Sequence, residues 1–596
     1  MHDAGPPTAP RRPLRVATLL DPWLRAAIDP ECRQVPVSAR RWRLPARRPD
    51  LLLVQATAVR GAPWSRGPAG SQEPAPALRR LVRGHAADGV PTVLWLTDPD
   101  GWRHDLATAR LFGTVLTVDP ASTAELAESL GHERVHVMAM AVQPRTVNPL
   151  VAPVPAARRA VLLGAALADD VEGPDEWLAT LVGARKDNRP QLVSVVQDDA
   201  AGPVADPGPD VLHAAVAAGK PAVDPAADLA PDPGAGPERL HGLRHASVPA
   251  HRLPGVYRAH EVVLARGGPG LPDLALRAAV EASAASVAVA VPDAAALEAQ
   301  HAGRLTLVPA GEAGADALRA LLGSPELRDR LAHRAMRHVL AHHTWAHRVD
   351  QLARLHGLPV TERRRCVTVV VPATRGHRLA RVLQQVGAQT HRDVELVVLD
   401  RGAGLDPADL VARARRAGLA PPALVPSSTA EALPDALHRA ADHLTGDLVA
   451  VLDELGHYAP RYLADQVAAA QWAPGAVLGK RAHYVHLEAT GATVLRHPGE
   501  EHRTVEALEP GTLLLPRALL ADLVAPPAEP GADAATTRDE PAADLVGRAR
   551  AAGVDLVATD RFSFLRRRET DGLRPELLPG TSLVQFYGPA EAHVDV

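Results

Sequence analysis

Short apolar runs typical of buried strands alternate with amphipathic helical segments along most of this chain. In its first 150 residues, strand-like runs occupy 15–20, 50–56, 91–98, 113–119 and 136–142. Helical segments lie between them, such as 77–89, which ends on Gly89. Parallel strands need a crossover connection, which is usually a helix. The alternation therefore predicts an α/β fold built on doubly wound parallel sheets.

The alternation divides into three units. We expect a first Rossmann-like domain at 14–155 and a second at 156–357, the latter interrupted by a loose insertion at 198–240 that is rich in Pro, Gly, Ala and Asp. A linker at 358–365 leads to a third domain at 366–596. A chain of 596 residues is long enough for three or four such domains.

The third domain opens on the apolar run 366–373, and further strand-like runs follow at 393–400, 447–454, 476–485 and 493–497. Its segment 526–541 is of low complexity, which predicts a mobile loop.

Composition excludes several classes of protein. The 65 Lys and Arg nearly balance the 69 Asp and Glu, and aromatic residues are only 3%, so we expect no nucleic-acid partner. The most apolar stretch, 278–291, contains Glu281 and is shorter than the roughly 20 residues that span a bilayer. Cys32 and Cys366 lie far apart and form no disulfide or metal pattern. We expect a soluble cytoplasmic protein without a signal peptide or a membrane span.

Acidic residues stand where two strands of the third domain end. Asp400 follows ELVVL, and Asp453 with Glu454 follows DLVAVL. Open parallel sheets bind ligands beyond the carboxyl ends of their strands. Carboxylates there can hold the base or ribose of a nucleotide sugar, or Mg²⁺ or Mn²⁺ against its diphosphate.

Several ordered motifs in this domain resemble family 2 glycosyltransferases. They are VVVPATR (369–375), Q-x-x-x-Q (385–389), ELVVLDRG (395–402), GDLVAVLD (446–453), LGKRAHYV (478–485), PGTLLL (510–515) and DRFSFLRRR (560–568). The resemblance implies a GT-A fold and an inverting sugar transfer. It implies that the nucleotide sugar is bound by Pro372, Thr374, Asp400, Asp453 and Glu454. It also implies a divalent metal, Mg²⁺ or Mn²⁺, for which Asp453, Glu454 and His457 are the candidate ligands.

The sequence departs from the family pattern at the strand ends. Leu455 and Gly456 stand where the family motif has its third and fourth acids. Arg401 stands where the family's DDGS motif has its second acid. Alternate residues of a strand share a face, so position 455 would be the natural metal partner of Asp453. Leu455 cannot bind a metal, so Asp453 and Glu454 can cooperate only if the backbone turns after the strand.

The acceptor hydroxyl needs a general base, which we expect before the helix 543–553. Asp539, Glu540 and Asp544 are the candidates, although none stands in the family's register. The alternative is that these residues form a solvated acidic loop.

The first two domains resemble the CgeB-like spore-maturation glycosyltransferases. The resemblance is carried by the segments 49–64, 89–103, 109–119, 130–149, 256–265 and 321–349. It implies a GT-B arrangement of two Rossmann-like domains with a donor site in the second, where Arg277 and Glu281 match. The family's Cys-Gly-Thr-Pro turn is Ala284 to Val287 here, and loss of its glycine removes close backbone approach to a phosphate. We therefore expect this half to be a scaffold or an acceptor platform.

Three histidines near the end of this half, His342, His343 and His347, include a pair spaced i, i+4. Such a pair can bind a metal when a third ligand is near. The sequence shows no third ligand, so the helix face is the favoured interpretation.

Two hypotheses for function follow. In the first, the chain is a glycosyltransferase that moves a sugar from a nucleotide-diphospho-sugar to a glycan or cell-envelope acceptor through its third domain. In the second, it is a catalytically impaired pseudo-glycosyltransferase that serves as a scaffold for other glycan-assembly proteins.

Overall fold

The described residues of this chain, taken from a computed structural model, form two compact units, one within 8–361 and one within 362–596. The structure describes residues 13–37, 48–59, 64, 73–98, 101–150, 161–163, 193–197, 244–248, 253–258, 260–265, 274–291, 301, 303–307, 312–360, 365–524, 543–568, 581–584, 591 and 594. The insertion expected at 198–240 and the loop expected at 526–541 lie outside these residues.

The first unit begins with a six-stranded parallel sheet in the order β2-β1-β3-β4-β5-β6. The strands are β1 (Arg15–Leu19), β2 (Arg33–Pro36), β3 (Leu51–Gln55), β4 (Thr92–Leu96), β5 (Thr114–Thr117) and β6 (Val135–Val137). The helices are α1 (Pro22–Ile28), α2 (Ala56–Val59), α3 (Pro76–Ala87), α4 (Leu106–Ala109) and α5 (Thr123–Leu130). Every residue of β3, β4 and β5 is buried, as expected where helices cover both faces of a parallel sheet.

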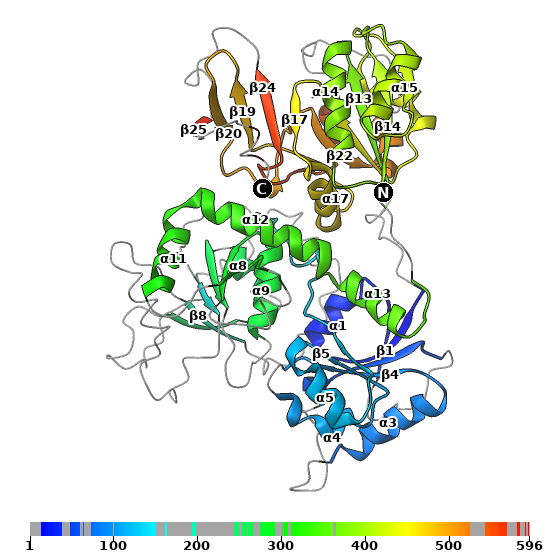
Figure 1. The fold of residues 1–596 in the computed structure, drawn as a ribbon, viewed down its shortest axis with the longest axis vertical. Helices are drawn as coiled ribbons and strands as arrows, with labels where there is room; N and C mark the ends of the chain where they lie inside the picture. The colour runs from blue at the N-terminus through cyan, green and yellow to red at the C-terminus, as the bar shows by residue number, and fades with distance from the viewer. Residues whose placement is uncertain are drawn as a thin grey trace. The chain divides into compact units, whose positions relative to one another are not determined.

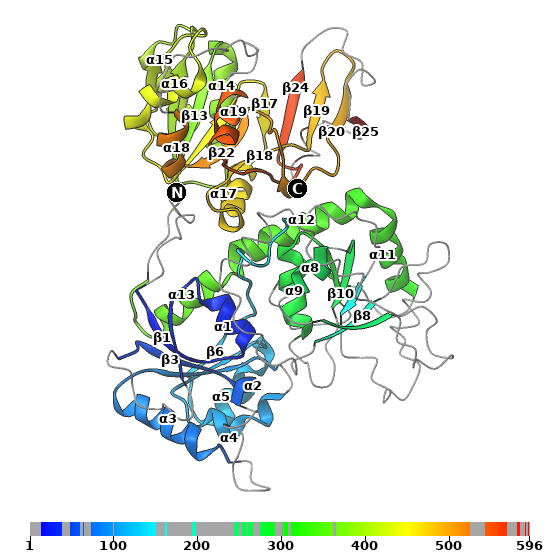
Figure 2. The ribbon, with the colours of Figure 1, turned by 180° about the vertical axis from the view of Figure 1, so that it is seen from behind.

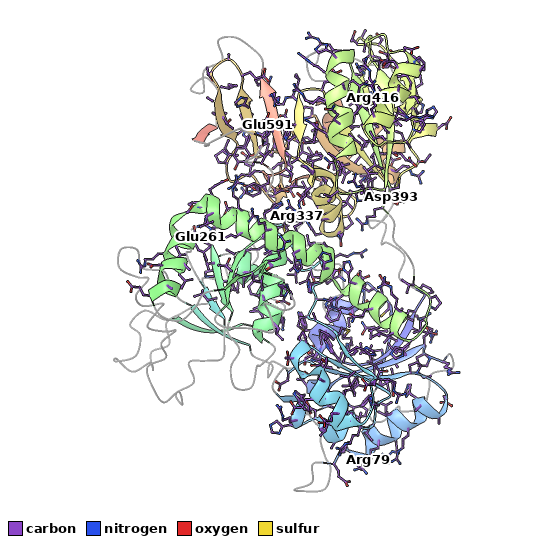
Figure 3. The ribbon with its side chains drawn as sticks, viewed as in Figure 1. Arg79, Glu261, Arg337, Asp393, Arg416 and Glu591 are labelled. Carbon is purple, nitrogen blue, oxygen red and sulfur yellow. The ribbon has the colours of Figure 1, made fainter. Side chains whose placement is uncertain are left out.

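A second six-stranded parallel sheet follows in the order β12-β11-β10-β7-β8-β9. Its strands are β7 (Val161–Leu163), β8 (Val193–Gln197), β9 (Arg244–Val248), β10 (Val262–Ala265), β11 (Ala288–Val291) and β12 (Thr306–Leu307). Its helices include α8 (Leu253–Arg258), α9 (Leu274–Ala284), α11 (Glu312–Gly323) and α12 (Pro325–His342). Arg328 of α12 lies 3.7 Å from Glu261, which stands just before β10. Figure 3 labels Glu261.

The last helix of this unit, α13 (Trp345–Leu355), packs in the core of the first sheet (Figure 1). Trp345 contacts Trp95 of β4 edge to face at 5.6 Å between ring centroids. Arg348 donates hydrogen bonds to the carbonyls of Ala139 and Met140, at 2.6 and 3.2 Å. The expected strand 136–142 is wrong beyond Val137: the chain continues irregularly to Val142, which forms an isolated parallel bridge with Thr344.

The second unit is built on an eight-stranded sheet in the order β15-β14-β13-β16-β22-β18-β23-β21. Its parallel part contains β13 (Val367–Ala373), β14 (Val394–Asp400), β15 (Ala423–Pro426) and β16 (Leu448–Leu452). The remaining strands are β18 (Val477–Gly479), β21 (Arg503–Thr504), β22 (Thr512–Pro516) and β23 (Leu556–Ala558), of which β22 runs antiparallel to β16.

Helices cover this sheet. They are α14 (Gly376–Gly387), α15 (Pro407–Arg416), α16 (Leu433–Arg439), α17 (Tyr462–Trp472), α18 (Arg517–Val524) and α19 (Ala543–Ala551). Figure 2 shows α16, α18 and α19 grouped together, and their apolar side chains share one buried cluster with β13, β14 and β16. A second sheet, in the order β17-β24-β19-β20-β25, contains β17 (Gly456–Tyr458), β19 (His483–Leu487), β20 (Ala492–Arg496), β24 (Phe564–Arg568) and β25 (Thr581–Val584).

The single strand expected at 476–485 is in fact two strands in two different sheets, β18 and β19. The break falls at Lys480, whose side chain is fully buried with its Nζ 2.9 Å from Oδ1 of Asp560. The backbone N–H of Lys480 donates to Oγ1 of Thr512 at 2.9 Å. A buried charge needs a partner of opposite charge. Lys480 meets its partner, Asp560, at the point where the chain leaves the eight-stranded sheet.

No helix among the described residues is both long and apolar enough to cross a bilayer.

Replacing Gly387 by Ala tests the contact between α14 and the end of α15. A Cβ there would clash with the backbone carbonyl of Ala417, which cannot rotate away as a side chain can. We expect Gly387→Ala to lower the free energy of unfolding of this unit by about 1–3 kcal/mol in denaturant titrations.

The matched control is Gly547→Ala in α19, where a Cβ would meet no atom within 4 Å. Because Ala favours the helix over Gly, this variant should be as stable as the parent or more so by up to ~1 kcal/mol. Equal destabilisation by both changes would contradict the packing argument.

Candidate functional site

The parallel strands of the second unit change direction of winding between β13 and β16. From β13 the chain proceeds outward to β14 and β15 on one side, and then returns to place β16 on the other. Such a switch point opens a crevice at the carboxyl ends of the two strands, which is where open α/β sheets bind ligands. Thr374 follows β13 and Asp453 follows β16, so residues predicted for the nucleotide-sugar site border this point.

Glu454 joins the two sides of the switch point. Its Oε1 accepts hydrogen bonds from the backbone N–H groups of Thr374 and Arg375, at 3.1 and 3.0 Å. Its Oε2 accepts the hydroxyl of Thr374 at 2.6 Å. The carboxylate therefore fixes the β13–α14 loop against the end of β16. Pro372, also predicted for the site, is buried within β13 beside Leu399 of β14.

Asp400 organises the loop that follows β14. Its carboxylate accepts backbone N–H groups from Ala403, Gly404 and Leu405 at 2.8, 3.2 and 2.9 Å. Arg401, which replaces the family's second acid, is buried and donates to the carbonyls of Thr429 and Glu431. Burial lowers the pKa of Arg401, and the nearby Glu431 partly opposes this shift. Both residues stabilise loops at the rim of the switch point.

Asp453 forms an ion pair with Arg566, a residue that the sequence analysis did not assign. Its Oδ1 accepts the backbone N–H groups of Leu455 and Gly456 at 2.9 and 2.7 Å, and its Oδ2 pairs with Nη1 of Arg566. The backbone of Gly511 packs directly against this carboxylate. The only sequence signal for Arg566 was its place in the run DRFSFLRRR (560–568).

Arg566 is shared between two carboxylates. It lies on β24, where it pairs with Gly456 of β17, and its Nε is 3.3 Å from Oε1 of Glu509. Burial is the main cause that lowers the pKa of Arg566 to about 10, so the side chain remains cationic near neutral pH.

The two glutamines of the Q-x-x-x-Q motif also have a structural role. Gln385 accepts the N–H of Tyr458 at 3.2 Å, and its Nε2 lies 3.2 Å from Nδ1 of His457. Gln389 donates to the carbonyl of Ala459 at 2.9 Å and accepts the N–H of Leu463 at 2.9 Å. Helix α14 and the turn that follows it thus hold the segment that leads from β17 into α17.

The predicted metal ligands Asp453, Glu454 and His457 do not converge on one point. Glu454 binds the β13–α14 loop, Asp453 faces Arg566, and His457 lies against Gln385. Among the described residues, the only three His, Cys, Asp or Glu side chains whose ligand atoms come together lie in the other unit. Mg²⁺ and Mn²⁺ need several oxygen ligands directed at a common centre. The residues present therefore do not fit a divalent cation at the end of β16.

The predicted acceptor base lies largely outside the described part of the chain. Asp539 and Glu540 are not among the described residues. Asp544 belongs to the first turn of α19, and only its backbone is described.

The two residues predicted for the donor site of the first unit, Arg277 and Glu281, form a buried group on α9. Glu281 is 0% exposed, and its two oxygens accept Nε of Arg277 at 2.9 Å and the hydroxyl of Tyr257 at 2.8 Å. The guanidinium of Arg277 lies 3.8 Å from the ring centroid of Trp23. Burial, followed by the charge of Glu281, raises the pKa of Tyr257 well above its usual value. Both oxygens of Glu281 thus already bind groups of the protein itself.

Two segments of the chain match families of glycosyltransferases. Residues 222–354 match the family described as "Glycosyl transferase-like", and residues 368–509 match "Glycosyl transferase family 2". The first segment belongs to the GT-B-like part of the chain and the second to its GT-A domain. No curated protein gives a significant match. The expected α/β fold class, with GT-B-like and GT-A domains in succession, is confirmed.

Several solved structures show weak similarity to this chain. Sucrose-phosphate synthase from Thermosynechococcus elongatus is 14% identical, with 51% of this chain and 73% of that one covered and a TM-score of 0.31. A glycosyltransferase from Rickettsia africae ESF-5 is 11% identical, with 58% and 89% covered and a TM-score of 0.34. TarS from S. aureus is 14% identical, with 34% and 37% covered and a TM-score of 0.25.

Removing Arg566 tests whether it holds this end of the site together. In Arg566→Gln the partly buried carboxylates of Asp453 and Glu509 lose their shared cation. We expect a loss of about 3–5 kcal/mol in the free energy of unfolding, measured by denaturant titration.

The control is Arg550→Gln in the same unit. Arg550 lies on α19 and pairs with Glu506 at 3.7 Å, and both side chains are exposed. Exposed pairs contribute about 0–1 kcal/mol, so this variant should be much closer to the parent. Similar losses in both variants would show that Arg566 has no special role.

The buried His483 predicts a dependence of stability on pH. Burial is the main cause that lowers its pKa to about 3, below the 6.5 of an unfolded chain. The charged or titratable groups that face it are Glu509, Arg496, His497 and Arg568. The unfolded chain takes up a proton below pH 6.5 whereas the folded chain does not, so stability falls as the pH drops from 6.5 towards 3.

Between pH 6.5 and 5 the slope contributed by His483 approaches ~1.4 kcal/mol per pH unit. We expect His483→Gln to flatten the measured slope of unfolding free energy against pH in this interval. The exposed His438→Gln should leave that slope unchanged. An unaltered slope in His483→Gln would contradict the assignment.

Proposed function

We propose that the chain is an inverting glycosyltransferase whose GT-A domain transfers a sugar from a nucleotide-diphospho-sugar to a glycan or cell-envelope acceptor. The observation that supports this most is the placement of Thr374, Asp453 and Glu454 around the switch point between β13 and β16. The match of residues 368–509 to family 2 covers the strands that form this point.

In this proposal the donor lies across the carboxyl ends of β13, β14 and β16. The loop shaped by Asp400 borders the nucleoside, and Thr374 with Arg375 borders the diphosphate. Arg375 is exposed and precedes α14, a helix of 12 residues whose first N–H groups favour an anion. A guanidinium there can offset charge that develops on the departing diphosphate.

The carboxylates at the end of β16 have a supporting role in this proposal. Glu454 positions the β13–α14 loop, and Asp453 positions Arg566. Because these groups do not fit Mg²⁺ or Mn²⁺, no step of the transfer depends on a metal. The acceptor hydroxyl attacks the anomeric carbon as its C–O bond to the diphosphate breaks. A base from 539–544 takes the hydroxyl proton.

We propose that the first unit serves as a scaffold or an acceptor platform, as its CgeB-like segments suggest. Its predicted donor glutamate, Glu281, already accepts two hydrogen bonds within the protein. The proposal places this work in the cytoplasm, where nucleotide sugars are made.

The test is turnover of a panel of UDP- and dTDP-sugars by the purified full chain, with EDTA or with Mn²⁺. We expect release of the nucleoside diphosphate in both conditions, with rates within about threefold of each other. We expect Arg375→Ala to reduce kcat/KM by at least ~10-fold, because a charged contact to the diphosphate contributes more than 1.4 kcal/mol.

The matched control is Arg381→Ala, which removes an exposed arginine further along α14. Its kcat/KM should stay within about twofold of the parent. A strict requirement for Mn²⁺ would overturn the metal-free step, and equal losses in both variants would overturn the role of Arg375.

The second candidate function is a pseudo-glycosyltransferase that acts as a scaffold for other glycan-assembly proteins. It is favoured by the internal pairing of Asp400, Asp453, Glu454 and Glu281, each of which binds groups of its own chain. This hypothesis predicts a folded chain that binds and turns over no donor. Donor turnover that Arg375→Ala abolishes would exclude it.

A further inference from the structure

Three histidines of the first unit come together in space although the sequence pattern did not group them. They are His301, His338 of α12, and His343, which directly follows α12. One ligand nitrogen from each lies within 4.8 Å of the others. The ring centroids are 4.6 Å apart for His301 and His343, 5.0 Å for His338 and His343, and 5.5 Å for His301 and His338. Of the three histidines singled out in the sequence, only His343 belongs to this group.

His301 is a buried polar side chain without a hydrogen bond. It is 1% exposed, and neither Nδ1 nor Nε2 has a hydrogen-bond partner among the described residues. Leaving buried polar atoms unpaired costs about 1–3 kcal/mol, so native proteins rarely keep them without a reason. The two rings that His301 faces are those of His338 and His343.

We propose that His301, His338 and His343 form a binding site for a divalent transition metal, with Zn²⁺ as the best match. Imidazole nitrogen suits Zn²⁺, Co²⁺ and Ni²⁺, whereas Mg²⁺ and Mn²⁺ prefer oxygen. Three histidines are a known ligand set for zinc, with solvent in the fourth position. Among the described residues no Asp, Glu or Cys joins this group.

The electrostatic state of the rings suits a metal. Burial is the main cause that lowers the pKa of His301 to about 3 and that of His343 to about 2. Both imidazoles are therefore neutral near pH 7, which is the form that binds metals.

Arg348 determines which tautomer His343 adopts without metal. Its Nη2 lies 2.8 Å from Nδ1 of His343, and since arginine only donates, that nitrogen accepts. The ring proton is then on Nε2, which lies 3.2 Å from Nε2 of His338. Metal binding at Nε2 moves the proton to Nδ1 and ends the contact with Arg348. Arg348 keeps the carbonyls of Ala139, Met140 and His342 as acceptors.

The site lies at the point where the chain passes from the second sheet to the core of the first. Val142 donates its N–H to the carbonyl of His343 at 2.9 Å, and Trp345 donates to the carbonyl of Val142 at 3.0 Å. Figure 3 labels Arg337 on α12, the residue before His338 in sequence. A metal bound here fixes the end of α12 relative to His301, so the role assigned is structural.

The test uses the full chain stripped with EDTA and titrated with Co²⁺ and then Zn²⁺. We expect one equivalent of Co²⁺ to give the intense visible bands of a tetrahedral site, and Zn²⁺ to displace it and raise the Tm. His301→Ala and His338→Gln should each weaken Co²⁺ binding at least ~10-fold, as loss of one ligand requires.

The control is His342→Ala, which removes an exposed histidine beside the site that is not one of the three ligands. It should bind Co²⁺ within about twofold of the parent, and circular dichroism should show that every variant is folded. Absence of the Co²⁺ bands in the parent, or equal affinity in His301→Ala and His342→Ala, would overturn the site.

Discussion

The ion pair between Asp453 and Arg566 determines what the end of β16 can do. Arg566 belongs to the small second sheet, and its pairing with Asp453 joins that sheet to the parallel one. A carboxylate held by an arginine no longer has both oxygens available for a cation. The same contact that joins the two sheets thus occupies one oxygen of a carboxylate that was predicted to be a metal ligand.

In both predicted donor sites a carboxylate is paired with an arginine of the chain itself. Glu281 is paired with Arg277 on its own helix, and Asp453 is paired with Arg566 across two sheets. After β14, Arg401 stands where the family has an acid, and its guanidinium donates to the carbonyls of Thr429 and Glu431. In each case the arginine binds oxygen atoms of its own chain.

Much of the fold could be predicted from the sequence because its signals are local. The apolar runs that became β3, β4, β13 and β16 are buried on both faces, and such strands show as continuous apolar stretches. The split between β18 and β19 could not be predicted this way. It depends on Asp560, which lies eighty positions after Lys480, and no local pattern reports so distant a partner.

The same limit applies to the sites. Asp400, Asp453 and Glu454 were found because each follows an apolar strand, but which group each one binds depends on Arg566, Thr374 and other distant residues. His338 and His343 are close in sequence, whereas His301 is brought to them only by the tertiary fold. Sequence spacing therefore singled out His343 but neither His301 nor His338, and it found the carboxylates but not their partners.

The return of α13 to the first sheet has a consequence for synthesis of the chain. The core around Trp95 is incomplete until Trp345 has left the ribosome, because the two rings pack against each other. At ~5–20 residues per second the ribosome takes roughly 10–40 s to travel from Val142 to Thr344. During that time the sheet of β1 to β6 lacks α13. The sheet of β7 to β12 lies between Val142 and Thr344 in sequence, so it must be synthesised before the first sheet can be completed.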